Sequence, residues 1–78
     1  MQPVLRYGAS GPAVELVQRR LKEAGFPPGR IDGVFGRATE AALVAFQRAG
    51  ALLADGVVGP VTWGKLAGLG AGITDDLS

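Results

Sequence analysis

Apolar residues recur every three or four positions in three stretches of the chain, which is the spacing of one face of an α-helix. The stripes are Val14, Val17, Leu21 and Ala24, then Ala42, Leu43, Phe46 and Ala49, and finally Trp63 and Leu66. Leu16 and Val44 fall beside these stripes, so we expect them to be partly exposed or to touch loops. The pattern predicts three amphipathic helices that share one core.

Glycine and proline set the expected helix limits. Gly11-Pro12, Gly36 and Gly59-Pro60 predict helix starts near residues 11, 36 and 59, because proline suits a first helical position whose N–H has no partner. Thr39 and Thr62 then fall in a first turn, where a hydroxyl can satisfy a free backbone amide. Glycines at positions 25, 50, 68 and 70 predict the three helix ends.

The segments that connect the helices contain little strand pattern. Ile31–Phe35 and Leu52–Val58 can each form a short extended piece, but Gly33 and Gly56 interrupt them. We therefore expect an all-α fold, a small three-helix bundle with ordered Gly-rich loops. Residues 1–70 form the expected domain, and residues 71–78 are expected to be a tail or linker stub.

An internal repeat links two of the predicted helix starts. Residues 32–43 and 55–66, which are 23 positions apart, are identical at six of twelve positions. Each copy begins with Asp-Gly, in which the aspartate can bond backbone amides two residues on and the glycine can adopt a positive φ. Two copies are too few for a solenoid, so the repeat predicts one loop-to-helix structure that is used twice.

The composition narrows the chemistry of this 78-residue chain. It holds neither Cys nor His, which excludes disulfides, Ser–His and Cys–His nucleophile pairs and soft metal sites. Only carboxylates remain for acid–base work, and nothing indicates that Asp32 and Asp55 face one another at a catalytic separation. We expect no free-standing enzyme, no catalytic residue, no cofactor and no bound metal.

Charge and hydropathy restrict the partners. The formal net charge is +1, whereas nucleic-acid binding needs a clustered basic face. No stretch is long and apolar enough to span a membrane, and the first residues lack the apolar region of a signal peptide. We expect neither nucleic-acid nor membrane partners, and a monomer.

Several segments together resemble the three-helix type of peptidoglycan-binding domain that is attached to bacterial and phage cell-wall hydrolases. The segments that carry the resemblance are residues 14–21, 32–36, 39–47 and 55–63, within a match from about Leu5 to Leu66. Two Asp-Gly-x-x-Gly copies, each followed by a threonine, with Phe46-Gln47 between them and Thr62-Trp63 after them, make it specific. Arg37 stands where such domains usually have proline.

The resemblance implies a non-catalytic module that binds bacterial peptidoglycan and anchors a fused or associated hydrolase or effector, as in endolysins. It implies a location in the cell envelope or outside the cell. The alternative is a structural domain that docks onto a protein of a larger phage-tail, injection or secretion assembly. Retention on insoluble peptidoglycan distinguishes the two.

Nine residues are candidates for contact with such a ligand, and each also has a structural interpretation. Asp32 and Asp55 are more simply explained as turn formers, and the rings of Phe35 and Trp63 as core, with an edge left for a sugar as the alternative. Gln18 and Gln47 either bond a loop carbonyl or present an amide to a peptide. Tyr7 is the most accessible ring, and Arg30 and Arg37 are the best cations for a stem-peptide carboxylate; the nine are Tyr7, Gln18, Arg30, Asp32, Phe35, Arg37, Gln47, Asp55 and Trp63.

Overall fold

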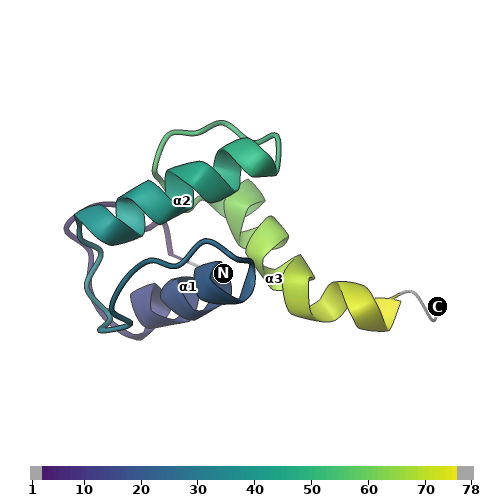
Figure 1. The fold of residues 1–78 in the computed structure, drawn as a ribbon, viewed down its shortest axis with the longest axis horizontal. Helices are drawn as coiled ribbons and strands as arrows, with labels where there is room; N and C mark the ends of the chain where they lie inside the picture. Colours follow the sequence, from purple (N-terminus) through teal and green to yellow (C-terminus); the bar gives the residue numbers. More distant parts are fainter. Residues whose placement is uncertain (1–2, 76–78) are drawn as a thin grey trace.

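The computed structural model describes residues 3–75, and the side chains of residues 3–67. Its three helices are α1 (Pro12–Glu23), α2 (Arg37–Ala49) and α3 (Pro60–Asp75) (Figure 1). Between residues 3 and 75 the remaining regular pairing is two isolated β-bridges. α1 packs against both α2 and α3. The predicted all-α, three-helix fold is confirmed.

Each helix begins directly after a predicted glycine. The carbonyls of Gly11, Gly36 and Gly59 accept the N–H four residues on, at 3.2, 3.0 and 2.9 Å, which closes the first turn of each helix. Pro12 and Pro60 are the first helical residues of α1 and α3, where a missing N–H costs nothing. The three expected starts are therefore confirmed.

The expected ends hold for two helices and are wrong for the third. α1 and α2 end just before Gly25 and Gly50, but α3 continues through Gly68 and Gly70 to Asp75. Glycine weakens a helix interior by about 1 kcal/mol relative to alanine but keeps its N–H, whereas only proline removes that donor. Of the expected tail, residues 71–75 are thus helical, and residues 76–78 lie outside the described part of the chain.

The core draws on all three helices and on the loops. Ala49 is a wrong core prediction: it is exposed and lines an open hollow of about 240 Å³ with Phe26 and Phe46. Leu16 is 41% exposed, and Val44 lies beside Gly56, as expected for residues beside the stripes. The buried apolar side chains are Leu5, Val14, Val17, Leu21, Phe35, Ala42, Leu43, Phe46, Val58, Trp63 and Leu66.

The segment before α1 joins both repeat copies. Leu5 forms a two-bond antiparallel bridge with Val58, at 3.2 and 2.8 Å. Gly8 donates to the carbonyl of Phe35 at 2.9 Å, and Phe35 donates to that of Ala9 at 2.8 Å. Residues 3–11 therefore connect two loops that are distant in sequence. Within the described residues, no helix is both long and apolar enough to cross a bilayer.

Candidate functional site

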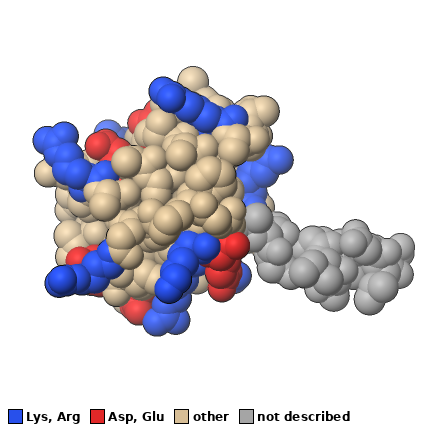
Figure 2. All heavy atoms as spheres, viewed as in Figure 1, with Lys and Arg blue, Asp and Glu red and all other residues tan. Residues whose placement is uncertain are grey.

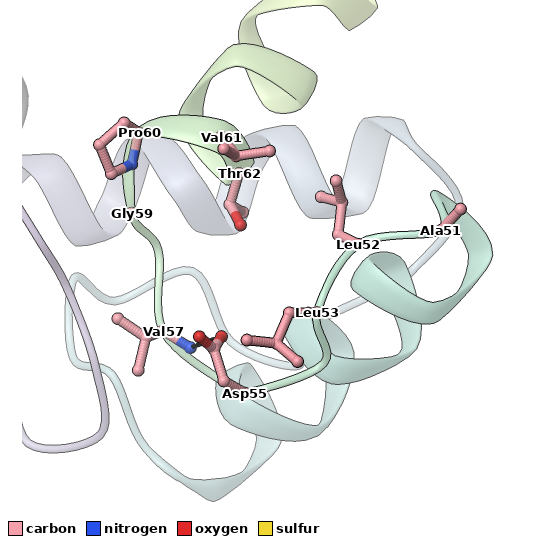
Figure 3. A pocket seen from close by; sticks show the side chains of 9 residues that line it. All are labelled: Ala51, Leu52, Leu53, Asp55, Val57, Gly59, Pro60, Val61 and Thr62. Carbon is pink, nitrogen blue, oxygen red and sulfur yellow. Dashed lines mark hydrogen bonds between the residues drawn. The ribbon is translucent and has the colours of Figure 1, made fainter.

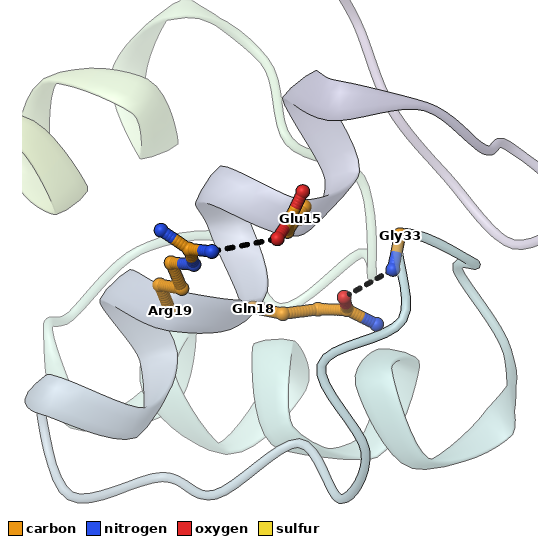
Figure 4. Close-up of polar contacts among 4 residues, drawn as sticks. All are labelled: Glu15, Gln18, Arg19 and Gly33. Atoms are coloured by element: carbon orange, nitrogen blue, oxygen red, sulfur yellow. Dashed lines mark hydrogen bonds and ion pairs between the residues drawn. The ribbon is translucent and has the colours of Figure 1, made fainter.

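The side chain of Gln18 holds the first Asp-Gly turn against α1 (Figure 4). Its Oε1 accepts the backbone N–H of Gly33 at 2.9 Å. Its Nε2 donates to Asp32 Oδ1 at 3.2 Å, to the carbonyl of Val34 at 3.0 Å and to Thr39 Oγ1 at 3.0 Å. One fully buried glutamine thus ties α1, the turn and the first turn of α2 together.

Gln47 repeats this arrangement one helix later. Its Oε1 accepts the N–H of Gly56 at 3.0 Å. Its Nε2 donates to Asp55 Oδ1 at 3.1 Å, to the carbonyl of Val57 at 3.0 Å and to Thr62 Oγ1 at 3.2 Å. The repeated structural unit therefore includes a glutamine from the preceding helix as well as the turn and the helix that follows.

Both glutamines are fully buried, so the structural interpretation of Gln18 and Gln47 holds and their amides are unavailable to a ligand. The two threonines differ from expectation. Thr39 and Thr62 lie in first turns, yet their hydroxyls accept from the glutamine amides instead of capping a backbone N–H. The two amide hydrogens of each glutamine are shared among three acceptors, of which the threonine oxygen is one.

Asp32 and Asp55 form the expected turns, with Gly33 and Gly56 at φ 76° and 70°. Asp32 Oδ1 accepts the N–H of Val34, and Asp55 Oδ1 that of Val57, both at 3.0 Å. These backbone N–H bonds lower the pKa of each aspartate from the ordinary 3.8, and the amides of Gln18 and Gln47 lower the pKa further. Each carboxylate is therefore ionised at neutral pH.

Phe35 and Trp63, the two candidate aromatic residues beside loops, are buried. Phe35 is 1% and Trp63 5% exposed, so both pack in the core and little ring surface remains for a sugar. Trp63 Nε1 donates to the carbonyl of Pro3 at 2.7 Å, which occupies the polar atom of the indole. Tyr7 is the accessible ring, as expected, and is 51% exposed.

Two surface hollows lie at equivalent places in the two repeat copies. One has a volume of about 200 Å³ and lies between residues 28–34 and the first turn of α2. The other has a volume of about 450 Å³ and lies between residues 51–57 and the first turn of α3 (Figure 3). Positions that lie 23 residues apart line the two hollows. Residues 28, 30, 32, 34, 37 and 38 line the first, and residues 51, 53, 55, 57, 60 and 61 line the second.

The two hollows share a backbone but differ in chemistry. Arg30 and Arg37 line the smaller one, which we call the basic hollow. Leu53 and Pro60 take their places in the larger one, the apolar hollow, where Leu53 is 80% and Val61 69% exposed. Repetition therefore yields one cationic and one apolar surface depression from the same local fold.

Of the nine predicted candidates, the basic hollow collects Arg30, Asp32 and Arg37. Tyr7 lies next to it, because the Arg37 guanidinium carbon is 5.1 Å from the centroid of the Tyr7 ring. That distance is within the range of a cation–π interaction. Asp55 lines the apolar hollow instead.

Charge elsewhere on the surface is dispersed. Lys and Arg side chains surround an uncharged centre on the face shown in Figure 2. On α1, the basic residues Arg19, Arg20 and Lys22 lie close together in the sequence. Arg19 pairs with Glu15 at 2.7 Å and Arg20 with Glu23 at 3.3 Å, so two of these three positive charges are offset. Among the described side chains, no group of three carboxylates is placed to hold a metal ion.

Comparison with known proteins agrees with this architecture. Residues 10–66 match the family described as "Putative peptidoglycan binding domain". The zinc D-Ala-D-Ala carboxypeptidase of Streptomyces albus G is 47% identical over 66 residues, which are 80% of this chain and 25% of that protein. The chain thus spans a quarter of the length of that relative.

Solved structures show the same fold. The SleB N-terminal domain has a TM-score of 0.82 at 43% identity, over 86% of this chain and 92% of that one. A Burkholderia AP3 phage endolysin has a TM-score of 0.81 at 42% identity, over 85% of this chain and 25% of that one. The family match over residues 10–66 and the shared fold together show that the chain belongs to the peptidoglycan-binding domain family.

Proposed function

We propose that this chain is a non-catalytic module that binds bacterial cell-wall peptidoglycan and holds an attached or associated hydrolase or effector on the wall. The family match over residues 10–66 carries this proposal. The similarity to a D-Ala-D-Ala carboxypeptidase and to a phage endolysin supports it, since each is several times longer than the shared domain. The module acts in the cell envelope or outside the cell, as a monomer.

The geometry of the carboxylates supports the non-catalytic part of the proposal. Asp32 and Asp55 are each hydrogen-bonded by their own glutamine and by a backbone N–H. A lowered pKa keeps them ionised, whereas a general acid at neutral pH requires a raised one. The turbidity of a wall suspension should therefore stay constant when the chain is added alone.

Sedimentation with purified insoluble peptidoglycan tests the binding itself. The chain should appear in the pellet at low salt, and soluble wall fragments should release it. Weak individual contacts suffice for this retention, because many repeated epitopes in the wall raise the effective concentration of binding sites. A chain that stays in the supernatant at low salt would refute the proposal.

The apolar hollow is the observation that favours the alternative, a domain that docks onto a protein of a phage-tail, injection or secretion assembly. Its exposed Leu53 and Val61 form an apolar depression of the kind that marks protein interaction sites. Leu53→Gln distinguishes the two functions. Peptidoglycan retention should survive this substitution if the wall is the ligand at another surface, and an assembly that uses the hollow should lose its partner.

A further inference from the structure

We propose that the basic hollow, lined by Arg30, Asp32 and Arg37, binds a free carboxylate of a peptidoglycan stem peptide. This inference rests on the proposed function and specifies which part of the wall polymer is recognised. It begins from the comparison of two equivalent hollows in one chain. The turn, the buried glutamine and the start of the helix are the same in both, so the arginines are not required by the local fold.

The second repeat copy shows that the local fold does not require the two arginines. Leu53 stands at the place of Arg30 and Pro60 at the place of Arg37, and both copies of the loop form the same turn and helix start. Gly36 has φ −101° and ψ −165°, an extended conformation that a following proline accepts. The backbone at residue 37 would thus tolerate proline, and an arginine there is available for contacts outside the fold.

Among residues 3–67, neither guanidinium forms a close ion pair with a carboxylate, although the charge of Arg30 helps to lower the pKa of Asp32. Between residues 3 and 67, the ion pairs are Glu15–Arg19 and Arg20–Glu23. Asp32 lies in the same hollow, but its Oδ1 accepts from Gln18 and from the N–H of Val34. Two arginines and one aspartate leave the hollow with one net positive charge.

The surroundings hold Arg37 in place and limit the ligand. Arg37 lies over the Tyr7 ring at 5.1 Å, which restricts its side chain and lowers the entropy cost of gripping an anion. The volume of about 200 Å³ is below the range of about 300–1,000 Å³ that is typical of sites for larger small molecules. It suits a terminal peptide residue better than a pair of sugar rings.

The chemistry of the ligand follows from the donor set. Guanidinium groups prefer planar carboxylates or phosphates, which accept two parallel N–H bonds. Within peptidoglycan, stem peptides supply carboxylates. Wall-attached polymers that carry phosphate are the other anionic source, and the experiment below separates the two.

The test uses the full chain and peptidoglycan that has been stripped of phosphate-containing polymers. Binding is measured by sedimentation on untreated sacculi and on sacculi whose free carboxyls have been converted to amides. We expect amidation to weaken binding of the parent chain by about tenfold, because charge-assisted hydrogen bonds are lost. The double variant Arg30→Gln/Arg37→Gln should bind untreated sacculi as weakly as the parent binds amidated ones, and amidation should not weaken it further.

A matched control removes the same charge elsewhere. Lys22→Gln/Arg48→Gln changes two exposed cations on α1 and α2 outside the hollow, and should keep parental binding and its sensitivity to amidation. Circular dichroism establishes that each variant is folded.

Two results would overturn the inference while the proposed function stands: equal binding of amidated and untreated sacculi, or an equal loss in the control variant. Binding to walls that keep their phosphate-containing polymers, with no binding to the stripped walls, would refute both. Failure of every variant and of the parent to bind any peptidoglycan would refute the proposed function, and this inference with it.

Discussion

Ala51, just past the end of α2, has a backbone φ of 59°, in the left-handed region that L-residues with a side chain disfavour. The equivalent position after α1 is Gly25, at φ 92°. The same hydrogen bond closes the end of each helix: Phe26 N donates to Leu21 O at 2.8 Å after α1, and Leu52 N donates to Gln47 O at 2.7 Å after α2. The second helix end therefore uses alanine where glycine fits better.

Ala51→Gly should stabilise the domain by about 0.5–1 kcal/mol. Glycine removes the strain of a left-handed backbone in the folded state, and this gain exceeds the cost of the greater freedom of glycine in the unfolded chain. The thermal unfolding midpoint should rise by a few degrees. Ala41→Gly, at an exposed helical position of α2, is the control and should destabilise by about 0.5–1 kcal/mol. A lower midpoint for Ala51→Gly would contradict the assignment of this residue to the helix end.

Asp32 and Asp55 predict how stability depends on pH. Because folding lowers the pKa of both from 3.8, the ionised groups stabilise the fold fully above the unfolded pKa. That stabilisation is lost as the pH falls through the lower folded pKa. The urea midpoint of unfolding should thus drop between about pH 5 and about pH 2. In the double variant Asp32→Asn/Asp55→Asn this drop should be smaller. If the urea midpoint of the variant falls with pH as steeply as that of the parent, other groups cause the drop.

At this scale the sequence predicts the turns but leaves the glutamines undecided. Asp-Gly chemistry is local, so the aspartates and the positive φ of Gly33 and Gly56 follow from two adjacent residues. The partners of Gln18 lie 14 to 21 positions away and those of Gln47 8 to 15. Gln18 precedes its aspartate by 14 positions and Gln47 by 8. The two glutamines are therefore not 23 positions apart, and a sequence repeat with that offset does not include them.

Between elements, Gln47 is the main polar link from α2 to the turn and to α3. Gln47→Leu should destabilise by at least about 2 kcal/mol, since the buried Gly56 N–H and the Thr62 hydroxyl lose their partner. Arg48→Leu is the neighbouring control at an exposed position, and should stay within about 0.5 kcal/mol of the parent. Chemical denaturation measures both, and equal effects would show that the glutamine bonds contribute little.

Helix starts could be predicted at this scale, and one helix end could not. A Gly-Pro pair acts locally, because it fixes backbone conformation at the first turn. Gly68 and Gly70 lower helix stability without removing a hydrogen-bond donor, so the continuation of α3 to Asp75 depends on a balance of small energies. The equivalence of the two hollows also required the fold, since Pro28 and Ala51 lie outside the repeat that is visible in the sequence.

For the whole molecule, Phe46 tests the placement of the core. It is 6% exposed and meets Phe26 edge to face, with ring centroids 5.9 Å apart. Phe46→Ala should cost about 3–5 kcal/mol, as much as the total stability that a domain of this size usually has. The variant should be largely unfolded at room temperature by circular dichroism, whereas Phe46→Leu should still unfold cooperatively; parental melting of Phe46→Ala would refute the core.

The overall architecture could be predicted because hydrophobic spacing and glycine placement agree along the chain. The contribution of residues 3–11 could not. Those residues carry little periodic signal, and they act through backbone bonds to loops that lie 22 to 53 positions further on, from Gly11 to Gly33 at the short end to Leu5 to Val58 at the long end.

Those backbone bonds have a practical consequence for anyone who produces the domain. A fragment trimmed to the family match, residues 10–66, would lack Leu5, Gly8 and Ala9 and would present the backbones of Phe35 and Val58 as unpaired edges. Such edges invite chains to join one another, so the shortened fragment should aggregate at concentrations where the full chain stays dispersed. A reporter protein is better fused ahead of Pro3 than in place of the residues that follow it.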